Sequence, residues 1–163
     1  MEASPAKSPL QWREGARVTG KYEHTMDAKG RVFVPAKLRE RLGSSFHAAI
    51  GASREADGEV CRYLALYPND VWQKLEEKIS ALPSNQAAQA DVLLAYAALC
   101  EPDSQSRILI PQNLRDYAGL GKEVVITGSG DKAKLWDKET WERRSAPRLD
   151  PGMVADMFEA LGL

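Results

Sequence analysis

The chain has 163 residues and a formal net charge of −1 at neutral pH, so its overall charge does not attract it to nucleic acid or to an anionic membrane. This length is enough for one domain with a proper core. The two cysteines are too few for a disulfide framework, and we find no apolar run of signal-peptide or membrane-spanning length. We therefore expect a cytoplasmic protein whose partners are bound by local patches.

A motif that occurs twice organises the sequence. Residues 1–16 are predicted to be a poorly ordered extension, and residues 17–26 a strand that leads into the first copy. The copies are Asp27–Glu40 and Asp103–Asp116, and Asp, Arg, Pro, Leu and Arg recur in both at matched places. Such self-similarity indicates a domain built from two related halves.

Each copy begins with a turn and a short strand. The side chains of Asp27 and Asp103 can accept hydrogen bonds from the backbone ahead, and Gly30 tolerates a positive φ. The runs Val32–Val34 and Ile108–Ile110 have no polar face, which is typical of strands buried on both sides. The tip of each turn therefore carries an Asp and an Arg just before a buried strand.

A short helix follows each strand. Pro35 and Pro111 end the strands and suit the first turn of a helix, where a missing N–H is harmless. Gly43 and Gly119 are suited to the positions just after the helix C-termini. The repeated unit is therefore a turn, a strand, a proline and a short helix.

The segment between the copies predicts a β-hairpin and then two helices. The hairpin consists of strands 46–50 and 60–67 joined by a polar loop at residues 53–59. An amphipathic helix begins at Pro68, ends at Pro83 and is followed by an Ala-rich helix over residues 86–99.

The second copy is followed by the same order of elements. We expect strands at 123–127 and 132–136, a helix at 137–144 capped by Asp137, a linker at 145–149 and an amphipathic helix at 151–163. The spacing of Tyr67 and Trp72 also recurs in Trp136 and Trp141, so both halves end in a strand and a helix.

These elements predict an α+β, mainly β, fold. The expected domain boundaries are a first repeat at 17–82, a connector helix at 83–99, a second repeat at 100–144 and a C-terminal tail at 145–163.

We find no pattern typical of an enzyme. His24 and His47 belong to no catalytic constellation, and the spacing of Cys61 and Cys100 is not that of a metal site. The repeated carboxylates each have an Arg four residues on, which predicts an ion pair and a lowered pKa in place of a general acid. The sequence thus predicts no catalysis, no cofactor, no metal and no small-molecule substrate.

Charge distinguishes the two copies. Residues 27–41 hold five cations and two anions, whereas residues 103–117 hold two of each. Positive charge beside a glycine allows the backbone to approach phosphates, and Arg can read guanine bidentately. The alternative, that these are solvated charges on a short helix, remains open. The candidate DNA-binding residues are Lys29, Gly30, Arg31, Lys37, Arg39 and Arg41.

The Asp and Arg of the two turns are assigned different roles. Arg31 is expected to reach DNA while Asp27 orients it. Asp103 and Arg107 are expected to form the matching pair and to fix the second turn structurally.

The sequence resembles the bacterial MraZ family. The residues that carry the likeness are Tyr22–Arg31, Asp103 and Arg107 of the second copy, Leu66–Pro68 and Lys134–Asp137. Ser106 differs from the family, which usually has Gly at this place in the second turn.

This resemblance implies a fold and a function. The implied fold is a tandem SpoVT/AbrB-like swapped-hairpin β-barrel whose protomers form a ring homo-oligomer. The implied function is transcription regulation of the division and cell-wall gene cluster, through double-stranded DNA with short G-rich direct repeats. We expect nucleoid association and no membrane partner. The alternative is an oligomeric protein-interaction scaffold that does not bind DNA.

Overall fold

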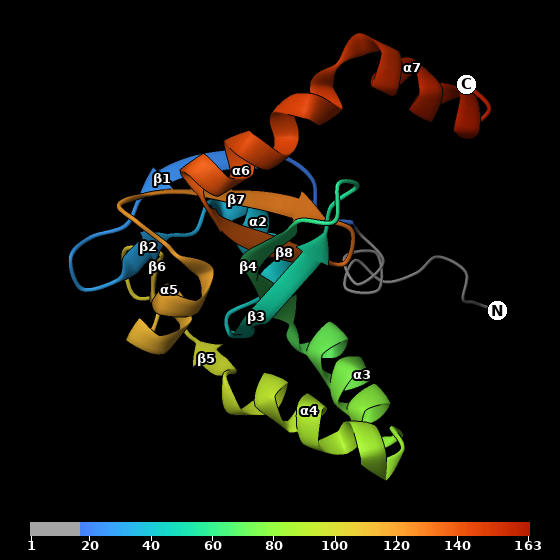
Figure 1. Cartoon of the computed structure of the whole chain (residues 1–163). Helices are drawn as coiled ribbons and strands as arrows, with labels where there is room; N and C mark the ends of the chain where they lie inside the picture. The colour runs from blue at the N-terminus through green and yellow to red at the C-terminus, as the bar shows by residue number, and fades with distance from the viewer. Residues whose placement is uncertain (1–16) are drawn as a thin grey trace, which may run out of the picture.

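The computed structural model describes residues 17–163, and the extension predicted at residues 1–16 lies outside this range (Figure 1). Its first half contains β1 (Lys21–Thr25), β2 (Arg31–Phe33), α2 (Ala36–Leu42), β3 (Phe46–Arg54), β4 (Val60–Pro68), α3 (Asn69–Ser80) and α4 (Ser84–Ala95). Its second half contains β5 (Ala98–Cys100), β6 (Arg107–Leu109), α5 (Gln112–Ala118), β7 (Glu123–Ser129), β8 (Lys132–Asp137), α6 (Lys138–Ser145), the 3₁₀ helix η1 (Ala146–Leu149) and α7 (Pro151–Ala160).

The two halves exchange strands in one antiparallel sheet of order β1-β7-β8-β4-β3-β5. β1 of the first half pairs with β7 of the second, and β5 of the second half pairs with β3 of the first. The hairpins β3–β4 and β7–β8 join where Ala65 lies opposite Lys134. The predicted fold class, two swapped-hairpin units in a single chain, is therefore confirmed.

The strands of the repeated motif form a separate two-stranded ribbon, β2–β6, in which Val32 lies opposite Ile108. These two side chains point inward and join the main core between the ribbon, α2, α5 and the sheet. The largest fully buried aliphatic and aromatic members of this core are Val32, Leu38, Leu42, Phe46, Leu64, Leu66, Ile108, Ile110, Leu114, Ile126 and Leu135.

Aromatic residues link each hairpin to the helix that follows it. The rings of Tyr67 and Trp72 have centroids 5.7 Å apart, and those of Trp136 and Trp141 have centroids 5.6 Å apart. The expectation that both halves end in a strand and a helix is confirmed. The indole N–H of Trp136 donates to the hydroxyl of Thr127 at 3.1 Å, which satisfies a buried polar group.

The prediction that the repeated strands are buried on both sides is wrong. Val32 and Ile108 are buried, but Phe33 and Leu109 are 41% and 58% exposed. A ribbon of two strands has one face against the core and the other in solvent. Successive side chains of a strand point to opposite faces, so every second residue is exposed.

Several boundaries also differ from the prediction. β3 continues through Ser53 and Arg54, because both pair with β4. The Ala-rich helix begins at Ser84 and ends at Ala95, since Ala98 and Leu99 pair with β3 as part of β5. The expected linker at 145–149 is the end of α6 and η1.

The predicted cap at Asp137 is right in its position but wrong in its hydrogen bond. Asp137 occupies the N-cap position of α6 but makes no side-chain capping bond. Its Oδ1 instead accepts a hydrogen bond from the backbone N–H of Gly121 at 2.9 Å.

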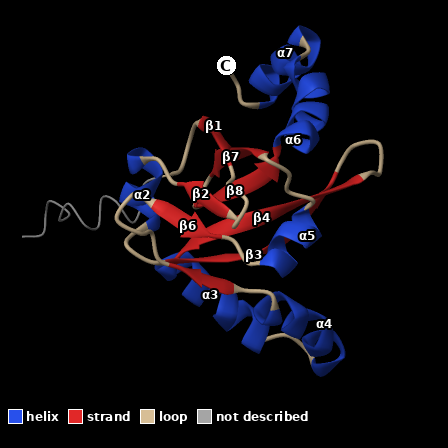
Figure 2. Cartoon of the chain, turned by 90° about the vertical axis from the view of Figure 1, so that its left-hand side faces the viewer, coloured by secondary structure: helices blue, strands red, loops and turns tan. Residues whose placement is uncertain are grey.

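Two helical projections leave the sheet in opposite directions. The α3–α4 pair extends from one end and α6–α7 from the other, in both views (Figures 1 and 2). None of the helices between Arg17 and Leu163 has the length and apolar character that a bilayer crossing requires.

Ile108 and Leu109 provide a matched test of the ribbon's two faces. Ile108 is 1% exposed, so Ile108→Ala should lower the free energy of unfolding by about 2–5 kcal/mol. Leu109→Ala should lower it by about 0.5 kcal/mol or less, because Leu109 faces solvent. Urea unfolding at matched protein concentration measures both; equal losses would contradict the one-sided ribbon.

Candidate nucleic-acid interface

The ribbon brings the two Asp–Arg turns to its two ends. Arg31 lies opposite Leu109 and Phe33 lies opposite Arg107. The pairing continues beyond the strands, where the backbone N–H of Val34 donates to the carbonyl of Ser106 at 2.8 Å. The two repeats are thus related by a local two-fold axis, and neither makes the ribbon alone.

In the first turn, one carboxylate holds both the backbone and the guanidinium. Asp27 Oδ1 accepts from the backbone N–H groups of Lys29 and Arg31 at 3.0 and 2.9 Å. Asp27 Oδ2 accepts from Arg31 Nε at 2.6 Å. Gly30 adopts a φ of +89°, and its N–H donates to the carbonyl of Asp27. The predicted ion pair between Asp27 and Arg31 is confirmed.

The second turn repeats this geometry. Asp103 Oδ1 accepts from the backbone N–H groups of Gln105 and Arg107 at 2.8 and 2.9 Å, and Oδ2 accepts from Arg107 Nε at 3.0 Å. Ser106 takes the place of the glycine and adopts a φ of +62°. The turn therefore keeps its form although a residue with a side chain occupies the left-handed position.

Each helix of the repeat sends an Arg to the turn of the other half. Arg39 Nη1 of α2 donates to the hydroxyl of Ser106 at 2.9 Å. Arg115 of α5 donates from Nε to the carbonyl of Ile110 at 2.9 Å and lies beside Gly30, where a Cβ would come within 2.6 Å of that nitrogen. Glycine at position 30 is therefore favoured by its φ of +89° and required by the close approach of Arg115 and of the Ile110 carbonyl.

The carboxylates of both turns are stabilised in their charged form. The backbone N–H of Arg31, followed by its side chain, lowers the pKa of Asp27 from 3.8 to about 2. The pKa of Asp103 is also lowered, chiefly by the backbone N–H of Arg107. Both groups are ionised at neutral pH, so they serve as fixed acceptors that position the arginines.

The outer face of the ribbon combines cations with apolar side chains. Arg31 and Arg107 are 36% and 32% exposed at their side chains, and they share this face with Phe33 and Leu109. The ring of His24 packs edge-on against Phe33 with centroids 5.2 Å apart. We call Arg31, Phe33, Arg107 and Leu109 the ribbon face.

The guanidinium groups of the ribbon face have free ends. Each Asp engages only the Nε of its Arg. Within residues 17–163, no acceptor engages the Nη atoms of Arg31 or Arg107. Each Arg is therefore held through Nε, while its two Nη atoms remain able to donate hydrogen bonds.

The candidate DNA-binding residues occupy four different environments. Lys29, Gly30 and Arg31 come together in the first turn, and the side chain of Lys29 is exposed. Lys37 is exposed near the start of α2, which directly follows β2. No residue of the described chain forms an ion pair with Lys29 or Lys37.

Arg39 and Arg41 lie elsewhere. Arg39 contacts the second turn through Ser106, as described above. Arg41 pairs with Asp70 of α3 at 3.3 Å, and its side chain is only 10% exposed. Arg41 therefore ties α2 to α3, and we leave it out of the interface.

Phe33 and Leu109 were missed as members of an exposed site. Each copy has three consecutive apolar residues, so the sequence does not show that these strands alternate between buried and exposed side chains. The signal was present in the motif: if Arg31 faces solvent, the residue two positions later shares its side of the strand.

The histidine and cysteines considered as catalytic groups are packed among other side chains. His47 stacks on Trp72 with centroids 4.7 Å apart. Cys61 and Cys100 are free and buried, and burial raises the pKa of Cys100 to about 12. No group of three or more potential metal-ligating side chains occurs among residues 17–163.

Comparison with known proteins gives consistent matches. The family model of the MraZ protein, described as antitoxin-like, matches residues 18–95 and again residues 93–149. The transcriptional regulator MraZ of Carboxydothermus hydrogenoformans is 49% identical over 125 residues, covering 75% of this chain and 82% of that relative. The transcriptional regulator MraZ of Lachnoclostridium phytofermentans is 43% identical over 146 residues, covering 88% of this chain and 96% of that relative.

The fold and the comparisons point to the same family. A single chain that exchanges strands between two hairpin units and pairs their Asp–Arg turns is a tandem protein of the AbrB/SpoVT type. The chain belongs to the MraZ family, as the resemblance of its sequence implied.

Ser106 can be tested through its contact with Arg39. Ser106→Ala should lower the free energy of unfolding by about 1–3 kcal/mol, because it removes a hydrogen bond to a charged group while the positive φ remains. Ser106→Gly removes the same bond but relieves the backbone, so it should be about 1 kcal/mol more stable than Ser106→Ala. Urea unfolding measures the difference, and identical stabilities would contradict this account.

The lowered pKa of Asp27 predicts a pH dependence. A carboxyl group with a depressed pKa in the folded state stabilises the protein above its unfolded pKa, and this stabilisation is lost as pH falls through the folded pKa. The stability advantage of the wild-type protein over Asp27→Asn should thus be complete above pH 3.8 and shrink toward about pH 2. Chemical unfolding of both proteins along this pH series tests the window; a constant difference would argue against it.

Proposed function

We propose that the chain is a transcriptional regulator that binds double-stranded DNA through the ribbon face and its flanking lysines. The observation that carries the proposal is the pair of arginines, each held at Nε by an Asp, with free Nη atoms on one exposed face. Guanine presents two acceptors in the major groove, which the end of a guanidinium can contact bidentately.

The size of the ribbon supports an approach to the major groove. Each strand has three residues, or about 10 Å of extended chain. The major groove is about 12 Å wide and admits a two-stranded β-ribbon. Phe33 and Leu109 would then lie against base edges, where apolar side chains can contact the methyl group of thymine.

The lysines give the first turn the larger share of the binding. Lys29 and Lys37 are exposed and free of ion pairs in the described structure, so they suit contacts to phosphates. The second half has Gln105 and Asn113 at these places. We therefore assign the main contact to Lys29, Gly30 and Arg31, and a weaker one to Arg107.

The family relationship supports the finer parts of the proposal. We infer a ring of protomers that binds G-rich direct repeats upstream of the division and cell-wall gene cluster. A chain of net charge −1 gains little affinity from long-range attraction, so each protomer is expected to bind weakly. Several linked copies on repeated sites would supply the missing affinity by raising the effective concentration.

Substitutions at Arg31 test the DNA contact. Arg31→Ala should weaken binding to the protein's own upstream DNA by about tenfold or more, because a contact to guanine is worth about 1–3 kcal/mol. Arg31→Lys should keep charge but relax the preference for guanine, since Lys lacks the planar fork. Fluorescence anisotropy measures both, and unchanged affinity of a folded Arg31→Ala protein would refute the proposal.

Salt dependence separates phosphate contacts from base contacts. Lys29→Gln should make the slope of log affinity against log salt shallower by about 0.9 for each phosphate that the lysine neutralises. Lys74→Gln is the matched control, because Lys74 is exposed on α3, away from the ribbon. Equal changes in the two variants would show that only overall charge matters.

A further inference from the structure

The last helix, α7, does not pack on the sheet. All of its residues are exposed, and it continues from η1 away from the body of the protein (Figure 2). Apolar side chains recur along one side of it at helical spacing. This α7 stripe consists of Met153, Val154, Met157, Phe158 and Leu161.

A helix of this length needs a partner. α7 has ten residues, and isolated helices of fewer than about 12–15 residues are marginal in water. Asp150 caps it by accepting hydrogen bonds from the N–H groups of Gly152 and Met153 at 3.1 and 3.3 Å. One cap contributes about 1 kcal/mol. The N-terminus of the helix is therefore capped, but its stripe lacks the tertiary packing that normally stabilises an amphipathic helix.

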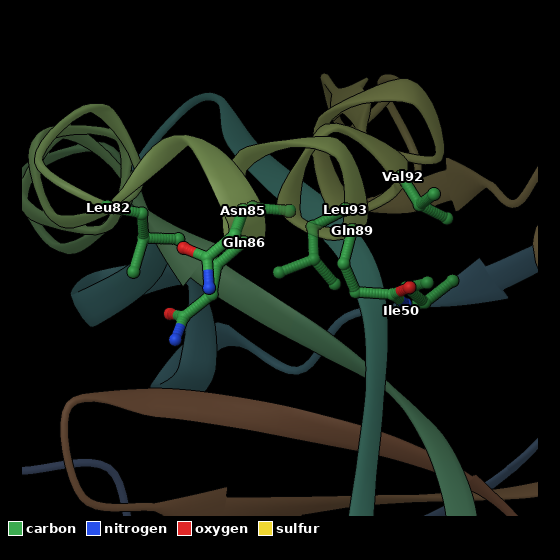
Figure 3. Close-up of a pocket in the computed structure, with 8 residues that line it drawn as sticks. Ile50, Leu82, Asn85, Gln86, Gln89, Val92 and Leu93 are labelled. Atoms are coloured by element: carbon green, nitrogen blue, oxygen red, sulfur yellow. The ribbon is translucent and has the colours of Figure 1, made fainter.

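The chain also carries an apolar groove. It lies between α4 and β3 and has a volume of about 460 Å³ (Figure 3). Its lining consists of aliphatic side chains and three side-chain amides, and none of the lining residues is charged. We call it the α4 groove, lined by Ile50, Leu82, Asn85, Gln86, Gln89, Ala90, Val92 and Leu93.

The stripe and the groove match in chemistry and length. From Asn85 to Leu93 the groove follows about 12 Å of helix, and from Met153 to Leu161 the stripe covers about 12 Å. The aliphatic face of the helix suits the aliphatic side chains that line the groove, and the amides of Asn85, Gln86 and Gln89 add no charge to it.

The stripe and the groove lie at opposite ends of the molecule. α7 and α4 project in opposite directions in both views, so they do not meet within one chain (Figures 1 and 2). A contact between two different surfaces of identical chains is heterologous, and such contacts repeat head to tail, giving a ring where the rotation between protomers closes and an open filament where it does not.

The charges on α7 argue against other occupants. Residues 149–163 carry Asp150, Asp156 and Glu159 and no Lys or Arg. An acidic segment is repelled by DNA phosphates and by anionic lipid surfaces, which attract basic amphipathic helices. The uncharged groove of a second copy presents no such repulsion.

We propose that the α7 stripe of one protomer occupies the α4 groove of the next and so closes the ring. This inference rests on the proposed function, because it supplies the contact by which several ribbon faces are presented to repeated DNA sites. Docking would bury Met157, which is 61% exposed in the single chain, against the walls of the groove.

Two lysine substitutions on α7 form a matched pair. Met157→Lys places a charge in the stripe, whereas Ala155→Lys places the same charge on the opposite side of the helix. Native mass spectrometry should find the wild-type oligomer in Ala155→Lys and smaller species in Met157→Lys. Circular dichroism controls for folding, and an intact oligomer in Met157→Lys would overturn the inference.

Cross-linking identifies what the stripe contacts. A Met157→Cys protein and a Gln89→Cys protein, mixed under oxidising conditions, should form disulfide-linked heterodimers, since Cys61 and Cys100 are buried. Homodimers of Met157→Cys alone would instead indicate stripe-to-stripe pairing and would overturn the assignment of the groove. The absence of any cross-link, with oligomers present, would overturn it as well.

DNA binding distinguishes failure of this inference from failure of the proposed function. Met157→Lys should bind a single repeat as the wild-type protein does, and bind a multiple-repeat DNA about 10²–10⁴-fold more weakly. Loss of single-repeat binding in every protein, with the cross-link intact, would refute the DNA proposal and leave the docking of α7 standing.

Discussion

The structure depends on the pairing of β2 with β6. A three-residue strand has no stable existence alone, and each repeat supplies only one half of the ribbon. The pairing of β2 with β6 gives the backbone groups of both strands hydrogen-bond partners, and it places Val32 and Ile108 in the main core. The same register turns Arg31 and Arg107 outward, so the interaction that completes the core also builds the ribbon face.

The strand exchange explains why two unequal halves can share one scaffold. β1 and β5 each pair with the hairpin of the other half, so each half supplies an edge strand to the other's part of the sheet. The Asp–Arg geometry is consequently retained in both turns, including the one where Ser106 adopts a positive φ. The surface was free to diverge, and the lysines beside the first turn have no cationic counterparts in the second.

The swapped-hairpin fold was predicted through the family resemblance, whereas the site features predicted from the residues themselves were those fixed by local chemistry. The Asp27 turn, the positive φ of Gly30 and the ion pair with Arg31 follow from residues within four positions of one another. The contacts of Arg39 and Arg41 could not be predicted from the sequence, because their partners, Ser106 and Asp70, are far away along the chain. The boundary of α4 was misjudged for a similar reason. Pairing with β3 at the sheet edge overrode the helix propensity of the Ala- and Leu-rich segment.

In the proposed complex, the outer face of the ribbon lies against DNA. Solvent paramagnetic relaxation of methyl groups, measured by NMR with and without DNA, tests it directly. Leu109 and Leu99 are both more than half exposed, and they lie on the ribbon face and on β5, respectively. Saturation with upstream DNA is predicted to protect the methyls of Leu109 and to leave those of Leu99 unchanged. Equal solvent accessibility of Leu109 in the free and the DNA-saturated protein would contradict the account.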